Sequence, residues 1–487
     1  MRSAKATVTM LLVVATLLAA CGTRLPDSDF AVTARIAVAG DTPAEVAGAA
    51  EELTPGEQAT PVAGADSSDE PAATGQPKVA PGSRGVNQAS DVGITATTIT
   101  LGNITAENGV LGDAFAPAVR GLRAWVAATN AKGGVNGRTI ILKTCDDRED
   151  RSRALACAQK LVEHDKVFAL VATNTRAMGG AAQYLNDQAV PVIGIPINNS
   201  FYRYPHFWSG YPNSYTRDGK TVGYKGKLVS RSGVYRWFKQ NTKATKAAVF
   251  TYDIDESKQA GTLFTKGLEL EGFQVTSYTV SFAAPSFDQA VAQMQRDGTQ
   301  LILDGMDDGA NRKLCDAMAR RNFTVLAKVS TPVSFGENVG TAYNDTCRNS
   351  VFIAGTSIPY TATNIPAVSE FRRAFARYQP GLPVHQWAME AWTQAVMVSD
   401  GIRAMATSPT RKGLEDYLRA MRGFTAGGIL TGLQYAPTNF DTPTARECFG
   451  VSRWLDSKGG WVEAAATFPF CYDDAKQYLT DPLEQGN

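Results

Sequence analysis

The feature that most constrains the fold is an alternation of strand-like and helix-like segments, which runs twice along the 487-residue chain. Apolar runs such as VFALVAT (167–173) are typical of buried strands, and the segments between them have helical periodicity. The first run comprises predicted strands at 98–104, 138–145, 167–173 and 191–195 and predicted helices at 114–134, 150–162 and 177–188. The second comprises strands at 246–252, 273–281, 299–305 and 324–331 and helices at 258–272, 286–298 and 310–322. This pattern predicts an α/β fold with parallel sheets covered on both faces, in two lobes that face a cleft.

The N-terminal segment is typical of a signal peptide. Arg2 and Lys5 precede a short apolar run, Val8 to Ala20, which is too short for a comfortable membrane span. The small residues before Cys21 resemble a bacterial lipoprotein signal. We therefore expect residues 1–20 to be removed and Cys21 to be lipidated, which would hold the protein at the outer side of the cell membrane. The alternative is an ordinary signal peptide followed by a chance cysteine.

The next segment differs in composition from the rest of the chain. Residues 22 to about 90 are rich in Ala, Pro, Gly, Asp, Glu and Ser and have almost no aromatic residues. Such a segment buries too little apolar surface to offset the ordering of its backbone. We predict that 21–91 is a disordered tether, with a short strand at 30–40 as the alternative for that part.

Charge and motifs exclude several classes of function. The formal net charge of +1 gives no electrostatic reason to expect nucleic-acid binding. The sequence has no G-x-S-x-G, P-loop, H-E-x-x-H or C-x-x-C-H motif, and it has only three histidines, His164, His206 and His385. We therefore expect a protein that is not an enzyme and that needs no metal or cofactor.

Several successive segments resemble one protein family. They are ITLGNITAENGVLG, AWVAATNAKGGVNGRTIILKTCDD, RALACAQKLVEHDKVFALVATNT and QAVPVIGIP, followed by AAVFTYDIDESKQAGTLFTKGLELEGFQV and FDQAVAQMQRDGTQLILDG. Over about residues 94–470 the chain resembles the type I periplasmic solute-binding proteins of ABC importers, in the branch of the leucine/isoleucine/valine-binding proteins. The resemblance implies two Rossmann-like lobes joined by three crossovers. Lobe 1 would hold 92–217 and 353–447, and lobe 2 would hold 218–352 and 448–487.

The cysteines predict disulfides. Without Cys21 six cysteines remain, an even number in an exported chain. Cys145 ends a predicted strand and Cys157 lies on the next helix; a metal site would need more ligands, and a redox pair is more often C-x-x-C. The family often has a disulfide in this neighbourhood, which favours a Cys145–Cys157 bond. Under the same resemblance we predict Cys315–Cys347 and Cys448–Cys471, the latter between two consecutive terminal strands.

Candidate ligand-binding residues follow the strands, because ligands of open α/β sheets bind beyond the carboxyl ends of strands. The candidates in lobe 1 are Thr105, Glu107, Asn174, Thr175, Arg176, Pro196, Asn198 and Asn199. The family holds the ligand carboxylate at positions that match Asn174 and Thr175, although plain helix capping explains these residues too. Pro196 lacks a backbone donor, and this departure puts standard amino-acid recognition in doubt.

The candidates in lobe 2 and near the hinge are Tyr252, Asp253, Met306, Asp307, Asp308, Thr331 and Tyr215. An acid among Asp307 and Asp308 would pair with a ligand ammonium; the alternative is a solvated helix start. Thr331 stands where the family often has a glutamate. Tyr202, Trp208 and Tyr211 make the hinge neighbourhood aromatic, which suits an apolar or planar part of a ligand.

These features together predict a lipid-anchored extracytoplasmic receptor. We expect a monomer that binds a small polar solute, such as an amino acid, an amide or a related organic compound, between two lobes. Its partner would be the permease of an ABC importer. The alternative is a ligand-sensing or surface-interaction lipoprotein that uses the same fold without transport. The ligand itself is not identified by the sequence.

Overall fold

The computed structural model describes residues 85–109, 111–211, 226–433, 435 and 443–481. The chain divides into two units, Met1–Ala73 and Thr74–Asn487, and every described residue belongs to the second. The expected signal peptide, Cys21, the tether up to residue 84 and Tyr215 therefore lie outside the described residues. Within the described part, no helix has both the length and the apolar character of a membrane span.

The first sheet is entirely parallel, as the sequence predicts. Its strand order is β2-β1-β3-β4-β5. The strands are β1 (Thr98–Thr105), β2 (Thr139–Asp146), β3 (Ala169–Thr173), β4 (Val192–Gly194) and β5 (Phe207–Ser209). The central strand β3 is buried at every position, because helices cover both of its faces.

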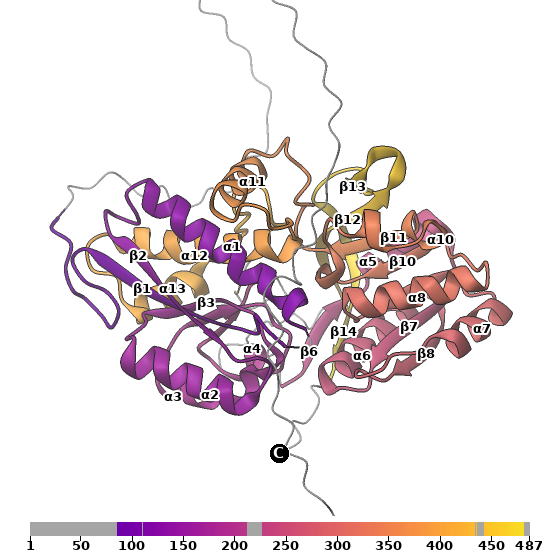
Figure 1. Ribbon diagram of the computed structural model, residues 1–487, viewed down its shortest axis with the longest axis horizontal. Coiled ribbons are helices and arrows are strands. Elements are labelled where there is room, and N and C mark those ends of the chain that lie inside the picture. Colours follow the sequence, from indigo (N-terminus) through magenta and orange to yellow (C-terminus); the bar gives the residue numbers. More distant parts are fainter. Residues whose placement is uncertain (1–84, 110, 212–225, 434, 436–442, 482–487) are drawn as a thin grey trace, which may run out of the picture. The chain divides into compact units, whose positions relative to one another are not determined.

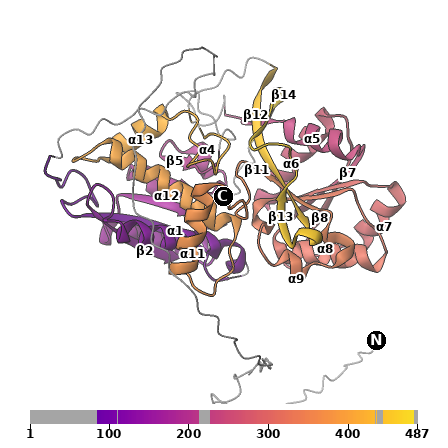
Figure 2. The same ribbon diagram turned by 90° about the horizontal axis from the view of Figure 1, so that it is seen from above.

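The helices around this sheet come from two distant parts of the sequence. Those interleaved with the strands are α1 (Gly112–Ala131), α2 (Arg151–Gln159), α3 (Ala182–Asp187) and α4 (Ser200–Arg203), with the π-helical turn η2 (Lys160–His164) and the 3-10 turn η3 (Arg176–Gly180). The later ones are α11 (Pro366–Tyr378), α12 (Gln386–Ala404) and α13 (Arg411–Ala420), drawn in orange in Figures 1 and 2. Helix α12 packs along α1. The two backbones touch at Gly121, where a Cβ atom would lie 1.9 Å from the Ala388 carbonyl oxygen.

The second sheet is mixed. Its order is β6-β14-β12-β11-β10-β9-β7-β8, and β13 pairs with β12. The strands are β6 (Leu228–Arg231), β7 (Lys246–Tyr252), β8 (Gln274–Val280), β9 (Leu301–Asp304), β10 (Ala327–Ser330), β11 (Val351–Gly355), β12 (Thr444–Leu455), β13 (Gly460–Glu463) and β14 (Phe470–Thr480). From β8 to β11 the sheet is parallel, as predicted. Strands β12, β13, β14 and β6 pair antiparallel, which the sequence analysis did not predict. The yellow terminal strands join this sheet in Figure 2.

The helices of the second sheet lie between its strands in the sequence. They are α5 (Gly233–Thr242), α6 (Asp255–Leu270), α7 (Asp288–Asp297), α8 (Asp308–Arg320), α9 (Val339–Ala342) and α10 (Asp345–Arg348), with 3-10 turns η4 (Pro332–Ser334) and η5 (Asp456–Lys458). Helices α6, α7 and α8 agree with the predicted helices to within a few residues.

The chain passes between the two sheets three times, after β5, after β11 and after α13. This is the two-lobed α/β arrangement that the sequence predicts. The second and third passages pair with each other through backbone hydrogen bonds, from Ile358 N to Ile429 O at 2.8 Å and from Thr431 N to Thr356 O at 2.9 Å. Strand β11 lies wholly in the second sheet, and the predicted lobe boundaries remain a prediction.

Arg138 anchors the chain where it enters the first sheet. Its side chain is fully buried just before β2. It donates to the carbonyl oxygens of Thr95 at 2.8 Å, of Gln88 at 3.2 Å and of Thr407 at 2.5 Å. One guanidinium therefore ties the segment before β1 to the chain that follows α12.

The structure contains the three predicted disulfides. Cys145 at the end of β2 bonds Cys157 on α2, Cys315 on α8 bonds Cys347 on α10, and Cys448 on β12 bonds Cys471 on β14. β12 and β14 are neighbours in the sheet, although β13 lies between them in the sequence. Each disulfide links elements of the same sheet and its helices.

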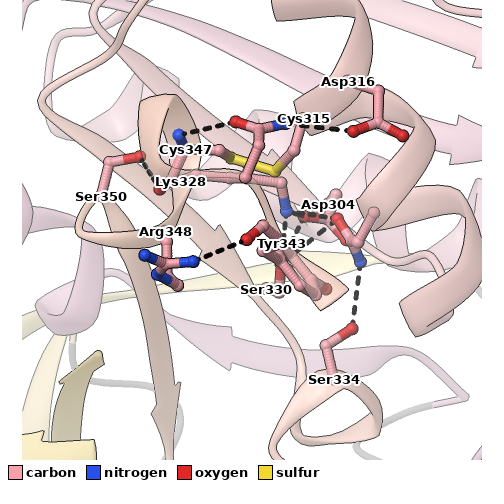
Figure 3. The surroundings of a disulfide bond; sticks show 12 residues. Asp304, Cys315, Asp316, Lys328, Ser330, Ser334, Tyr343, Cys347, Arg348 and Ser350 are labelled. Atoms are coloured by element: carbon pink, nitrogen blue, oxygen red, sulfur yellow. Dashed lines mark hydrogen bonds and ion pairs between the residues drawn. A yellow bond between two sulfur atoms is a disulfide. The ribbon is translucent and has the colours of Figure 1, made fainter. Parts of the chain in front are cut away.

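A buried ion pair lies beside the Cys315–Cys347 disulfide (Figure 3). Lys328 on β10 and Asp304 at the end of β9 are both fully buried and 2.9 Å apart. The lysine also donates to Ser330 Oγ at 2.8 Å and to the side-chain oxygen of Asn311. Asn311 in turn donates to Ser334 Oγ at 3.0 Å. This network fixes the carboxyl ends of β9 and β10, from which the loops of the candidate site start.

Candidate ligand-binding site

A cavity of about 340 Å³ lies at the carboxyl ends of the strands of both sheets. One side of its wall comes from the loops after β3, β4 and β5 and from the first turns of α1 and α12. The other side comes from the loops after β7, β9 and β10 and from the first turns of α6. This is the place where open α/β sheets bind ligands, and the volume suits a small organic molecule.

Seven of the candidate residues line the cavity: Arg176, Pro196, Asn198, Asn199, Tyr252, Asp307 and Thr331. The strand-end rule identified these residues, because each ends a parallel strand or lies within five residues after one. The remaining candidates of the described part lie outside the cavity wall and contact other parts of the protein.

In lobe 1 the candidates outside the wall are Thr105, Glu107, Asn174 and Thr175. Thr105 and Asn174 are buried and pair with each other as an isolated parallel bridge between the ends of β1 and β3. Glu107 forms an ion pair with Arg123 through two hydrogen bonds of 2.7 and 2.8 Å. Thr175 caps the turn η3 by accepting a hydrogen bond from Ala177 N at 3.0 Å. These side chains stabilise the loops, and residues next to them in those loops line the cavity.

In lobe 2 the candidates outside the wall are Asp253, Met306 and Asp308. Asp253 accepts a hydrogen bond from Phe282 N at 2.8 Å and so fixes the loop that carries this ring. Met306 is fully buried in the core. Asp308 accepts hydrogen bonds from Tyr343 Oη at 2.9 Å and Asn338 Nδ2 at 2.6 Å, and burial raises its pKa.

The wall contains many apolar and aromatic side chains that were not among the candidates. They include Leu111, Phe115, Ile197, Tyr202, Tyr211, Ile254, Phe264, Phe282, Val333 and Trp387. The rings of Phe115 and Trp387 lie 5.8 Å apart and those of Tyr252 and Phe282 lie 5.1 Å apart. The aromatic sequence around Tyr202 and Tyr211 was a usable signal, and so was the position of Phe282 after a strand. Trp387 gave no such signal, because its helix resembles a core helix throughout.

Arg176 is bound to groups on both sides of the cavity. Its guanidinium forms an ion pair with Glu149 at 2.6 Å, and the two side chains are 22% and 8% exposed. The same group stacks on the Phe282 ring, with its carbon 4.7 Å from the ring centre. The positive charge is therefore largely balanced by Glu149 and covered by an aromatic face.

Asp307 is also bound within the protein. Its carboxylate caps α8 by accepting hydrogen bonds from Gly309 N at 2.7 Å and Ala310 N at 3.2 Å. The Tyr252 hydroxyl donates to the other carboxylate oxygen. Burial and the Asp307 charge both raise the pKa of Tyr252, so the phenol keeps its proton.

A polar chain leads from the cavity wall into helix α12. Trp387 Nε1 donates to Tyr211 Oη at 2.8 Å, and this hydroxyl donates to Glu390 Oε2 at 2.8 Å. The other Glu390 oxygen accepts from Ser357 Oγ at 2.6 Å. Burial raises the pKa of Glu390 to about 7, although both hydrogen bonds act to lower it. Glu390 thus joins the segment after β5 to the segment after β11.

The comparisons with known proteins agree with this geometry. A family model described as "Periplasmic binding protein" matches residues 98–458. The chain belongs to the periplasmic binding protein family. No curated protein sequence matches it.

Solved structures of periplasmic binding proteins share the fold. A fatty acid ABC transporter substrate-binding protein from Thermomonospora curvata has a TM-score of 0.62 and 16% identity, over 79% of this chain and 94% of that chain. An ABC transporter solute-binding protein from R. palustris in complex with benzoate has a TM-score of 0.58 and 15% identity, over 78% and 97%. A branched-chain amino acid transporter substrate-binding protein from Streptococcus pneumoniae, in complex with isoleucine, has a TM-score of 0.60 and 16% identity, over 79% and 100%. These likenesses establish the type I periplasmic-binding-protein fold, and the ligands of these proteins differ.

Proposed function

We propose that the protein is an extracytoplasmic receptor that binds a small organic molecule between its two lobes and delivers it to an ABC importer. The observation that carries the proposal is the cavity itself, because loops of both sheets contribute to its wall. A ligand that contacts both lobes stabilises the closed arrangement relative to the open one, so binding shifts the equilibrium between them. The permease would then recognise the closed, loaded monomer.

The lipid anchor is the second part of the proposal. It is supported by the small residues before Cys21 and by the apolar run that precedes them. A Cys21→Ser variant is expected to leave the membrane fraction and to appear in the soluble fraction, whereas the unmodified chain stays with the membrane. Retention of the variant at the membrane would exclude anchoring through Cys21.

The receptor function is tested by closure on binding. Labels on residues of the two lobes, for instance at Lys143 and Lys313, report the distance between the lobes by energy transfer. Small amines, amides and acids are screened as ligands. We expect a compound that binds to shorten the distance between the labels and to change the fluorescence emission of Trp387. A Trp387→Phe variant identifies the part of the emission that belongs to the cavity wall. A chain whose lobes keep the same distance with every compound contradicts the receptor function.

A transport assay separates the proposed function from ligand sensing. Importer vesicles that contain the permease and the ATPase should take up the ligand only when the receptor is added. If the receptor closes on its ligand and no importer encoded with it responds, the sensing alternative is correct.

A further inference from the structure

The cavity wall presents mostly apolar surface to a ligand. Phe115 and Trp387 form an aromatic pair on the side of the first sheet, and Tyr252 and Phe282 form one on the side of the second. Aliphatic side chains such as Ile197 complete the wall between them. A ligand that fills this space gains most by burying an aromatic or branched aliphatic body.

Among the described residues, three charged side chains line the cavity, and two of them already have partners. Arg176 is paired with Glu149 and stacked on Phe282, as described above. Asp307 receives the hydroxyl of Tyr252 and two backbone N–H groups of α8. The charges of these two groups are therefore balanced or hydrogen-bonded within the protein.

The third ionised side chain of the wall is Glu256, which lies half-buried in the first turn of α6. Among the described residues its carboxylate has no hydrogen-bond or ion-pair partner. Its position near a helix N-terminus stabilises the negative charge without using up the carboxylate oxygens. Within the described part of the wall, the one charged side chain without a partner is therefore negative.

We propose that the ligand has an aromatic or aliphatic body and carries no carboxylate, being either neutral or a single ammonium ion that pairs with Glu256. This inference rests on the proposed receptor function and names its ligand class. A ligand carboxylate would lie near Glu256 and Asp307, while Arg176, the only cation among the described wall residues, is held by Glu149. Pro196 offers it no N–H group. An ammonium would instead find a carboxylate and aromatic faces, which attract cations.

Two pairs of matched compounds test the class. Benzamide and benzoate have nearly the same shape and differ in charge, and 2-methylbutylamine is isoleucine without its carboxylate. Calorimetry with the full chain is expected to show that benzamide and 2-methylbutylamine each bind at least about tenfold more tightly than their carboxylate counterparts, because like charges in a desolvated site repel strongly. Equal or tighter binding of benzoate or isoleucine overturns the inference, and so does the failure of all four compounds to bind.

Variants at the start of α6 test the role of Glu256. Glu256→Gln should weaken the binding of 2-methylbutylamine about tenfold or more and leave that of benzamide within about twofold, since only the amine needs the charge. Asp255→Asn is the matched control, because Asp255 is exposed in the same helical turn and lies outside the cavity wall. Equal effects of the two variants on the amine overturn the assignment of Glu256.

The outcomes also separate this inference from the function on which it rests. If benzoate or isoleucine binds tightly and draws the lobes together, the receptor function stands and the ligand class is wrong. If the lobes stay apart with every compound of the wider screen, the receptor function itself fails.

Discussion

Lys328 and Asp304 form an ion pair with no exposed side-chain surface, on the interior strands β10 and β9 of the second sheet, whose carboxyl ends lead to the cavity. Such a pair is tolerated because every charged group has hydrogen-bond partners: Ser330 Oγ contacts both residues, and Asn311 contacts both as well. The pair is more a device for fixing the loops after β9 and β10 than a source of net stability, since removing two charges from water offsets much of their attraction.

Loss of one member of this pair should be strongly destabilising. A Lys328→Met variant leaves the Asp304 carboxylate buried without its counter-ion, and we expect the free energy of unfolding to fall by about 3–5 kcal/mol. Urea denaturation followed by circular dichroism measures the change. Lys412→Met is the control, because Lys412 is 83% exposed and its loss should change stability by no more than about 0.5 kcal/mol. A similar small effect at Lys328 would contradict the prediction.

At the same scale, the sequence located about half of the candidate site. The rule that ligands bind beyond strand ends identified residues such as Pro196, Tyr252 and Asp307, which line the cavity. It could not tell them from neighbours such as Glu107 and Asp308, because the partners that hold those carboxylates are distant in the sequence. Trp387 belongs to a helix that begins more than 50 residues beyond either strand run, and only the tertiary packing brings it to the wall.

Helix α12 packs in the core along its length, and its first turn contributes to the cavity wall. Fifteen of its residues are buried, which explains why its sequence resembles a core helix. Trp387 reaches the cavity wall, while Glu390, one turn later, holds Tyr211 and Ser357. The helix therefore connects the ligand site to two of the three segments that pass between the sheets.

The buried carboxyl of Glu390 should make stability depend on pH. Its pKa is raised from 4.5 to about 7 in the folded protein, so its contribution is complete below about pH 4.5 and is lost as the pH rises through 7. A Glu390→Gln variant stays neutral. Its stability relative to the wild type should therefore increase by on the order of 1–3 kcal/mol between about pH 5 and pH 8.

Urea denaturation at several pH values measures this difference. Glu370→Gln is the control, since Glu370 lies on the exposed face of the neighbouring helix α11 and pairs with Lys132 at the surface. The free energy of unfolding of the control variant should depend on pH in the same way as that of the wild type. If the free energy of unfolding of Glu390→Gln also followed that of the wild type at every pH, the pKa of Glu390 would not be raised in the folded protein.

The contact between α1 and α12 leaves no room for a side chain at Gly121. A Gly121→Ala variant places its Cβ atom against the backbone of α12 at Ala388, which cannot move without shifting the helix. We expect a loss of about 1–3 kcal/mol in the free energy of unfolding, despite the better helix propensity of alanine. Gly460→Ala is the control, because nothing lies within 4 Å of the added atom there. Equal thermal midpoints of the two variants would contradict this account.

Strands and helices with a clear hydrophobic pattern in the sequence could be predicted, and those without such a pattern could not. The parallel strands β1, β3 and β7 consist mainly of apolar or β-branched residues, so their positions agree closely with the sequence pattern. Strand β14 alternates irregularly between buried and exposed positions and follows a proline-containing segment, FPF. Its place beside β12 depends on pairing with a strand about 25 residues earlier, which no local pattern reveals.

For the molecule as a whole, the cross-links stay within the lobes. Each of the three disulfides joins elements that belong to one sheet and its helices, and the passages between the sheets are held by hydrogen bonds alone in the described residues. The covalent bonds therefore stabilise each lobe without restricting the movement of one lobe against the other.

Removal of a disulfide should consequently affect stability and spare binding. A Cys145→Ser/Cys157→Ser double variant is expected to lose about 2–4 kcal/mol of unfolding free energy, because the unfolded chain regains its freedom. Ligand affinity and the closing distance should equal those of the wild type at a temperature where both are folded. A drop in affinity with unchanged folded fraction would show that this disulfide shapes the site.

Arg138 fixes the end of the first sheet at which the described chain enters. It holds the incoming chain at the amino ends of the strands of the first sheet, whereas the cavity opens at their carboxyl ends. The described part of the chain therefore enters this lobe at the end opposite the cavity. None of the described residues before β1 lines the cavity, so substitutions among them should leave its wall unchanged.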